Sequence, residues 1–167
     1  SRAQAVLAAF QHAFDGYEQY AWGADEFKPR SGQPKNGVWG GMGMMILDAT
    51  DTAMIMGLER QVEKCRQHID QKIHFGTVNK VSFFETTIRA LGGLLGAYAM
   101  GGEADPALLR QAVEVANQLM KAQGKGDAMP SRFVDLQKGS ASQQKTSLAE
   151  VGSNLLELRY GTTVDLY

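Results

Sequence analysis

The chain has 167 residues, of which 44% are hydrophobic and 21% are charged, a composition typical of a soluble globular domain or a part of one. This composition excludes a disordered chain, a collagen-like chain and a bundle of membrane-spanning helices. The net charge of -1 provides no strong field for nucleic acid, so no nucleic-acid partner is expected. The single cysteine, Cys65, excludes an internal disulfide framework, and no Cys/His spacing matches a zinc site.

Apolar residues recur mostly at helical spacing, and this periodicity predicts six helices. Phe10 and Phe14, for example, mark one face of the first helix. Asp105 precedes a proline and an apolar run, which is typical of a helix N-cap. Glycine-rich segments predict two long loops, at 22–41 and 123–146. The expected helices cover residues 2–21, 43–56, 58–73, 82–100, 106–122 and 147–160.

The predicted helices differ in how much of their surface is apolar. Those at 43–56 and 82–100 are apolar on most sides, whereas those at 58–73 and 106–122 carry a polar face. Because a helix that is apolar all round is buried, we expect an all-α fold with an inner and an outer layer of helices. No long segment alternates between apolar and polar residues, so no β-sheet is predicted. The chain begins with Ser1 and helical periodicity starts at once, as in a piece of a longer protein.

Glu85 and Arg89 are four residues apart in an otherwise apolar helix, so their side chains lie on one face and can reach each other. Two interpretations are open. In the first, Ser82 and Glu85 form a capping box, and Arg89 is a helical ion-pair partner of Glu85. In the second, Glu85 is a carboxylic acid at the mouth of a helix barrel, held by a cation and able to donate a proton to a leaving group.

Other acidic residues are also open to a structural and a functional interpretation. Asp48 and Asp51 lie three residues apart on a nearly apolar helix, where they either accept bonds from loop amides and arginines or line a sugar or cation site. Glu150 follows a serine by three residues and again matches a capping box. Asp25 and Glu26 lie in the first long loop, where a solvated role is expected. The methionines and histidines form no ligand pattern, so no metal site within this chain is predicted.

Six short motifs follow one another along nearly the whole chain. In order they are Asp25-Glu26-Phe27-Lys28-Pro29-x-Ser31, Gly40-Gly41-x-Gly43, Leu47-Asp48-Ala49-x-Asp51-Thr52, Ile55-Met56-Gly57-Leu58, Phe84-Glu85-x-x-Ile88-Arg89-x-Leu91-Gly92-Gly93-Leu94-Leu95 and Leu148-Ala149-Glu150-x-Gly152. One such motif would be weak, but six in this order are specific. Together they resemble the class I α-1,2-mannosidases, glycoside hydrolase family 47.

The resemblance implies an (α/α)7 toroid of inner and outer helices, of which residues 1–167 would be the N-terminal portion of a single catalytic domain. It implies inverting hydrolysis of terminal α-1,2-linked mannose from high-mannose N-linked glycans, with a calcium ion at the floor of the barrel. Glu85 matches the family's general acid, Arg89 matches a substrate-contacting arginine, and Glu150 matches a residue that lines the sugar site. The implied location is the lumen of the endoplasmic reticulum or Golgi, with any membrane anchor before Ser1.

The chain departs from the family pattern at two leucines, after Tyr160, where the pattern does not define the last helical turn, and by the absence of several of the family's residues. Thr50 and Ala53 replace leucines, so the packing behind this helix is expected to differ. The family's other catalytic carboxylates, its disulfide and its calcium-binding threonine would lie beyond Tyr167. The remainder of the catalytic domain, including the calcium ligand, is therefore expected as another chain or as residues outside this one.

Two other classes of function remain open. A non-catalytic mannose-binding or glycan-binding relative would keep the barrel and Arg89 but need no working acid. A purely structural helical module would use Glu85 and Glu150 only as caps. The presence of both Glu85 and Arg89 favours the enzyme.

Overall fold

Helices form the framework of the computed structural model, which describes residues 1–121, 129–142 and 145–164. The helices are α1 (Arg2–Tyr20), α2 (Met44–Ile55), α3 (Glu59–Lys72), α4 (Phe83–Glu85), α5 (Gly92–Met100), α6 (Pro106–Met120), α7 (Leu148–Gly152) and α8 (Leu155–Thr163), with a 3-10 turn η1 (Phe75–Thr77) and a π-helical segment η2 (Thr86–Leu91). The five helices expected up to residue 122 are confirmed, although η2 interrupts the fourth. The fifth ends at Met120, and residue 122, where its end was expected, lies outside the described residues. The helix expected at 147–160 is instead two helices, α7 and α8, which separate at 153–154.

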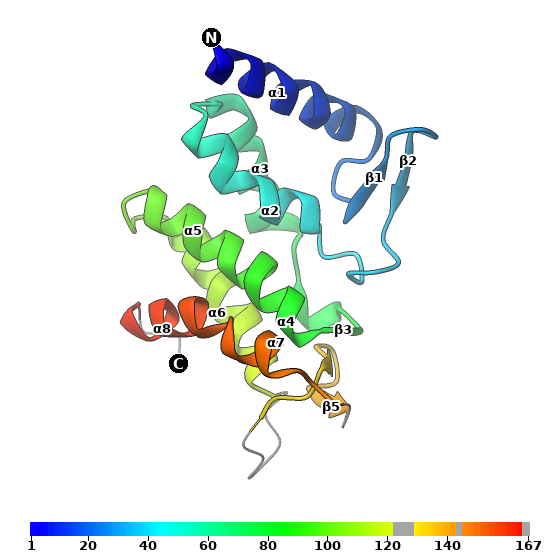
Figure 1. The fold of residues 1–167 in the computed structure, drawn as a ribbon, viewed down its shortest axis with the longest axis vertical. Helices are drawn as coiled ribbons and strands as arrows, with labels where there is room; N and C mark the ends of the chain where they lie inside the picture. Colours follow the sequence, from blue (N-terminus) through cyan, green and yellow to red (C-terminus); the bar gives the residue numbers. More distant parts are fainter. Residues whose placement is uncertain (122–128, 143–144, 165–167) are drawn as a thin grey trace.

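In Figure 1, α1 lies at one end of the molecule, α2 and α3 come next, α5 and α6 follow, and α7 and α8 lie toward the other end. Within the stack, α2 packs against α5, while α3 and α6 pack behind them and against each other. The sequence explains this arrangement, because α2 and α5 are apolar whereas α3 buries only Gln61, Cys65 and Ile69. The Asp105 carboxylate accepts the Ala107 N–H at 2.9 Å and begins α6 as predicted.

Helices α2 and α5 approach each other closely at a glycine. A Cβ atom added at Gly93 would overlap the backbone carbonyl oxygen of Leu47, so only glycine fits here. Thr50 and Ala53 fill the other side of α2 and are both buried. The Thr50 hydroxyl donates to the Ile46 carbonyl at 2.6 Å. This hydrogen bond satisfies the buried hydroxyl group that stands in place of a leucine side chain.

Five short strands within the described residues contradict the prediction that the chain contains no sheet. Strands β1 (Glu26–Lys28) and β2 (Gln33–Lys35) form an antiparallel hairpin inside the first predicted loop. Strands β3 (Lys80–Ser82), β4 (Phe133–Asp135) and β5 (Ser140–Ser142) form a second antiparallel sheet in that order. Strands of three residues are too short for an alternating pattern to be visible, which is why sequence periodicity missed them. The strands lie along one edge of the helical stack (Figure 1).

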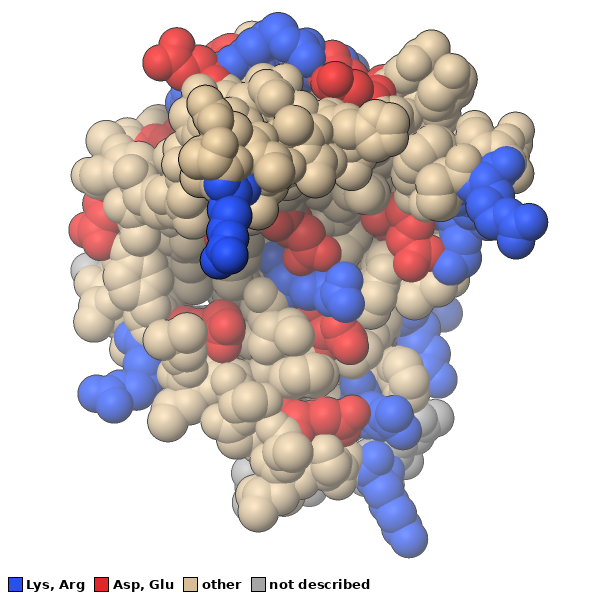
Figure 2. Space-filling model, turned by 45° about the horizontal axis from the view of Figure 1, so that its top comes forward, with Lys and Arg blue, Asp and Glu red and all other residues tan. Residues whose placement is uncertain are grey.

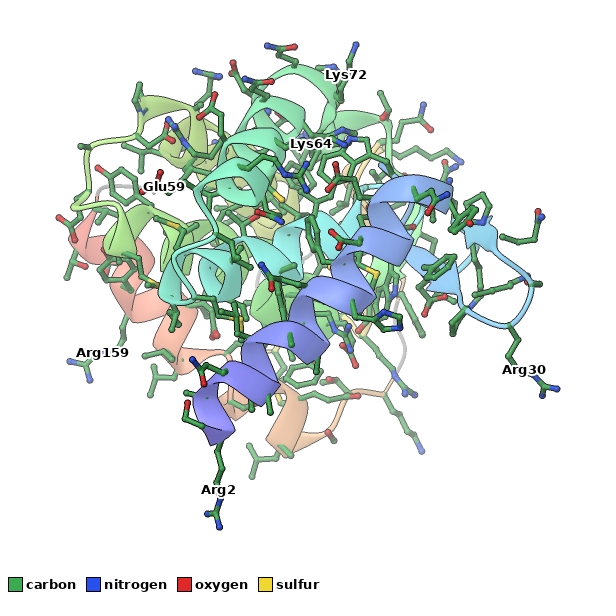
Figure 3. The ribbon with its side chains drawn as sticks, turned by 90° about the horizontal axis from the view of Figure 1, so that it is seen from above. Arg2, Arg30, Glu59, Lys64, Lys72 and Arg159 are labelled. Carbon is green, nitrogen blue, oxygen red and sulfur yellow. The ribbon has the colours of Figure 1, made fainter. Side chains whose placement is uncertain are left out.

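Charged side chains of both signs are interspersed over the face shown in Figure 2. Arg2, at the start of α1, and Arg30, at the tip of the β1–β2 hairpin, project away from the molecule (Figure 3). Lys64 instead bridges α3 and α1, because its ammonium group contacts Glu18 at 2.8 Å and lies 4.3 Å from the Trp22 ring centroid. None of the described helices has the length and apolar character needed to span a membrane.

Candidate active site

Arg89 is the centre of a charged cluster that joins two helical elements. Its Nε donates to Glu85 Oε2 at 2.7 Å, and its Nη1 donates to Asp48 Oδ2 at 3.2 Å. The guanidinium group also lies over the ring of Trp39, 4.9 Å from the ring centroid. Contact with a carboxylate was expected from the spacing of Glu85 and Arg89, and it is confirmed. An arginine partner was one of the two interpretations of Asp48, and the contact bears it out. That this arginine is Arg89, and that Trp39 also contacts it, was not predicted, because both residues are more than 40 positions from Arg89 in the chain.

Glu85 lies in the short helix α4, directly after strand β3. Its backbone N–H donates to the Ser82 hydroxyl at 3.3 Å, which is one half of a capping box. Its carboxylate accepts a bond from Arg89. The Ser82 cap and the Arg89 ion pair thus use different parts of Glu85, and both contacts belong to the structural interpretation of the sequence. The role of Glu85 as a proton donor stays a prediction.

The π-helical segment η2 carries Arg89 and was not predicted from the sequence. The Thr87 hydroxyl at its start donates back to the Phe83 carbonyl at 2.8 Å, and two glycines follow its end. The sequence feature that could have indicated this segment is a pair of threonines followed, a few residues later, by Gly92 and Gly93. π-Helical turns inside α-helices occur frequently at functional sites.

Asp48 and Asp51 contact different partners, although they lie only three residues apart on α2. Asp48 joins Arg89, and burial raises the pKa of its carboxyl group while the Arg89 guanidinium opposes this shift. Asp51 accepts the Thr52 N–H at 2.5 Å and faces Gly96 on α5. Asp48 therefore belongs to the candidate site, whereas Asp51 has a local structural role.

A cleft of about 390 Å³ opens beside Arg89 and Asp48. Phe10 of α1, Phe27 of β1 and Trp39 contribute aromatic rings to its wall. A concave wall of apolar rings with a few charged groups is typical of a small-molecule site. Such a wall suits a sugar, since the rings can cover its C–H faces while Arg89 and Asp48 bond to its hydroxyl groups.

Glu150 lies at the start of α7 and forms a complete capping box. Its N–H donates to the Ser147 hydroxyl at 3.1 Å, and its Oε2 accepts the Ser147 N–H at 3.3 Å. The other carboxylate oxygen lies 3.8 Å from the guanidinium group of Arg132. The Arg132 carbonyl accepts the Phe83 N–H at 2.9 Å, so Glu150 is linked to the start of α4. Glu150 has no direct contact with Arg89 among the interactions of the described residues.

Asp25 corrects the expectation of a solvated loop residue. Asp25 is only 3% exposed, because the loop before α2 covers it. Its neighbour Glu26 is partly exposed and pairs with Lys35 across the β1–β2 hairpin, so only Glu26 has a surface role. No pattern in the sequence distinguishes the two acids, since both stand side by side in one polar segment.

The site residues do not fit a calcium ion. In residues 1–121, 129–142 and 145–164, no group of three or more His, Cys, Asp or Glu side chains could hold a metal. The carboxylates of Asp48 and Glu85 already surround the Arg89 cation, which would repel a second cation.

Comparison with known proteins gives the class of this fold and site. The model of "Glycosyl hydrolase family 47" matches residues 9–164. The chain is 39% identical to the human endoplasmic reticulum mannosyl-oligosaccharide 1,2-alpha-mannosidase, over 95% of this chain and 23% of that protein. It is 37% identical to the mannosyl-oligosaccharide 1,2-alpha-mannosidase MNS1 of Arabidopsis thaliana, over 93% of this chain and 28% of that protein.

A solved structure gives the same answer for the fold. The chain superimposes on the alpha-1,2-mannosidase from Trichoderma reesei with a TM-score of 0.85 and 33% identity, over 98% of this chain and 37% of that one. The helices are thus part of a glycosidase toroid of the (α/α)7 type, as the motifs implied. The chain belongs to glycosyl hydrolase family 47. It spans about a quarter of the length of the curated relatives it matches.

Proposed function

We propose that residues 1–167 are the N-terminal portion of the catalytic domain of a mannosyl-oligosaccharide 1,2-α-mannosidase. The complete domain hydrolyses terminal α-1,2-linked mannose from high-mannose N-linked glycans with inversion at the anomeric carbon. The observation that carries this proposal is the cluster in which Arg89 holds Glu85 beside an aromatic-lined cleft. Membership of the family and the names of the similar enzymes support the substrate class.

Glu85 is the proposed general acid. It donates a proton to the glycosidic oxygen as the bond to the leaving sugar breaks. Arg89 fixes the position of the Glu85 carboxyl group through its Nε and has further N–H donors for sugar hydroxyl groups. Glu150 is a proposed substrate-binding residue, whose carboxylate oxygens also cap α7 and face Arg132.

The rest of the site comes from residues outside this chain. Inverting hydrolysis needs a second carboxylate, ~6.5–9.5 Å from the acid, to activate water on the opposite face of the sugar. Family membership supports a calcium ion, whose ligands we assign to the remainder of the catalytic domain. The proposed location is the secretory pathway, in the endoplasmic reticulum or Golgi lumen, and the name of the human relative, an endoplasmic reticulum enzyme, supports the first of these.

The Glu85→Gln variant tests the proposal in the protein that contains the complete domain. Glutamine keeps the shape and one acceptor oxygen but cannot act as the acid. Turnover of an α-1,2-linked mannobiose should fall about 10²–10⁴-fold, the range typical of general acid catalysis. Thermal unfolding should be almost unchanged, because the Ser82 hydroxyl accepts the backbone N–H of residue 85 in both proteins.

The Glu63→Gln variant is the matched control, since Glu63 is an exposed acid that contacts Arg66 on α3. It should turn over substrate like the wild type. Near-normal turnover by Glu85→Gln would contradict the catalytic role and leave Glu85 as a cap. A wild-type protein that binds mannobiose without cleaving it would instead support a non-catalytic glycan-binding relative.

A further inference from the structure

Asp25 is a buried carboxylate that the proposed reaction does not use. It has no ion-pair partner within the part of the chain that the structure describes. Its Oδ2 accepts the Gly41 N–H at 2.7 Å, and its Oδ1 accepts the Met44 N–H at 3.1 Å. Burial raises the pKa of Asp25, whereas hydrogen bonds from the backbone amides of residues 41–44 oppose this shift. The carboxylate thus replaces its lost water with the amides of one loop.

The loop at 40–43 has a shape that needs such an acceptor. Gly40, Gly41 and Gly43 have φ angles of 73°, 82° and 73°, in the left-handed region that favours glycine. Helix α2 begins directly after this loop, and its N-cap residue has no side chain with which to bond the first amides. Asp25 supplies that bond from 19 residues earlier in the chain.

The loop at 40–43 is joined to the acid–arginine pair through its neighbours, Trp39 on one side and the segment before Glu85 on the other. Trp39, which precedes the loop, stacks on the Arg89 guanidinium group. On the other side, a Cβ atom at Gly40 would lie 2.7 Å from Val78 and 3.8 Å from Val81, so the loop backbone lies against β3. Strand β3 ends at the serine that caps the turn with Glu85. A shift of the loop would therefore move the surroundings of Arg89 and Glu85 together.

We propose that Asp25 is a positioning residue, which sets the geometry of the Arg89–Glu85 pair by holding the loop at 40–43 in place. This inference rests on the proposed function for its effect on catalysis. Its structural part, the mechanical link from Asp25 to residues 83–91, stands independently. Because small misplacements of catalytic groups have large effects on rate, the loss should appear in turnover as well as in stability.

The Asp25→Asn variant, in the protein with the complete domain, tests this link. The asparagine amide keeps one acceptor oxygen but turns an NH2 donor toward a loop N–H, so one of the two hydrogen bonds to Gly41 and Met44 is lost. Hydrogen exchange, measured by mass spectrometry, should become faster in peptides from 39–48 and also from 83–91. The kcat/KM for α-1,2-mannobiose should fall about 10–100-fold. Asp15→Asn, a change on the exposed side of α1, should alter neither quantity.

A double variant separates positioning from general loss of structure. In a protein that already carries Arg89→Ala, the Asp25→Asn change should lower kcat/KM much less than it does in the wild type. The reason is that Asp25 acts on catalysis through Arg89, which is then absent. Multiplicative losses, or normal exchange at 83–91, would overturn the proposal. If Asp25→Asn does not fold, Asn36→Ala replaces it, since the Asn36 side chain accepts the Asp25 N–H at 2.9 Å. If the wild type lacks mannosidase activity, the proposed function fails, and exchange at 83–91 alone decides the role of Asp25.

Discussion

Glu85 and Glu150 both follow a serine by three residues, yet they use their carboxylates differently. Glu150 completes its capping box with Ser147, whereas the Glu85 carboxylate binds Arg89. The difference arises outside the local motif, because only Glu85 has an arginine one helical turn later in a helix that packs against α2. The same four-residue pattern therefore predicts a cap in both places, and only the neighbours identify the residue whose carboxylate binds an arginine of the cleft wall.

The two roles of Glu150 can be separated by Glu150→Gln in the protein with the complete domain. Glutamine serves a capping box almost as well as glutamate, so the melting temperature should hardly change. A sugar-binding role predicts that KM for α-1,2-mannobiose rises about tenfold, since hydrogen bonds to a charged group are worth about 1.5–3 kcal/mol. Steady-state kinetics and thermal unfolding measure both quantities. An unchanged KM would mean that Glu150 acts only as a cap.

At the scale of whole elements, the packing of α2 against α5 positions the site. Asp48 lies on α2 and Arg89 lies just before α5, so the ion pair between them spans the contact between the two elements. Gly93 permits the close approach, because its missing side chain leaves room for the Leu47 carbonyl. Any residue larger than glycine would push the two helices apart.

Gly93→Ala should therefore destabilise the fold. Alanine favours a helix by about 1 kcal/mol over glycine, but the backbone of α2 cannot move aside cheaply. We expect a net loss of about 1–3 kcal/mol in the free energy of unfolding, measured by urea denaturation. Gly37→Ala is the matched control, since no atom lies within 4 Å of the position that its Cβ would take. Equal stability of the two variants would show that the close approach is relaxed without cost.

At the scale of the whole molecule, charged contacts attach α1 to α3. Glu18 accepts bonds from Arg60 and Lys64, each at 2.8 Å, and its side chain is only 17% exposed. The hydrogen bond from Arg60 lowers the pKa of Glu18 to about 2; burial opposes this shift, and the contact with Lys64 adds to it. The contribution of Glu18 to stability is thus complete above its ordinary pKa of 4.5 and is lost as the pH falls toward 2.

Comparing the wild type with Glu18→Gln at several pH values tests this pH dependence. The wild type should be more stable at pH 6, and its advantage should shrink steadily as the pH is lowered through 4 to 3. Urea unfolding at each pH gives the difference in free energy. The control is Asp15→Asn, because Asp15 is well exposed and lies 3.9 Å from Arg60, where an ion pair adds little. A difference that does not vary with pH would rule out the lowered pKa.

The sequence alone determined the parts of this protein that depend on neighbours along the chain. Helical periodicity, the Asp105 cap and the pair of Glu85 and Arg89 are local, and the ordered motifs identified the family. Only the tertiary structure revealed that Arg89 also contacts Asp48 and Trp39, and that Asp25 is buried. It also revealed the pairing of β3 with β4, about 50 residues apart. These features depend on which surfaces meet when helices pack, and the pattern of a single segment does not contain that information.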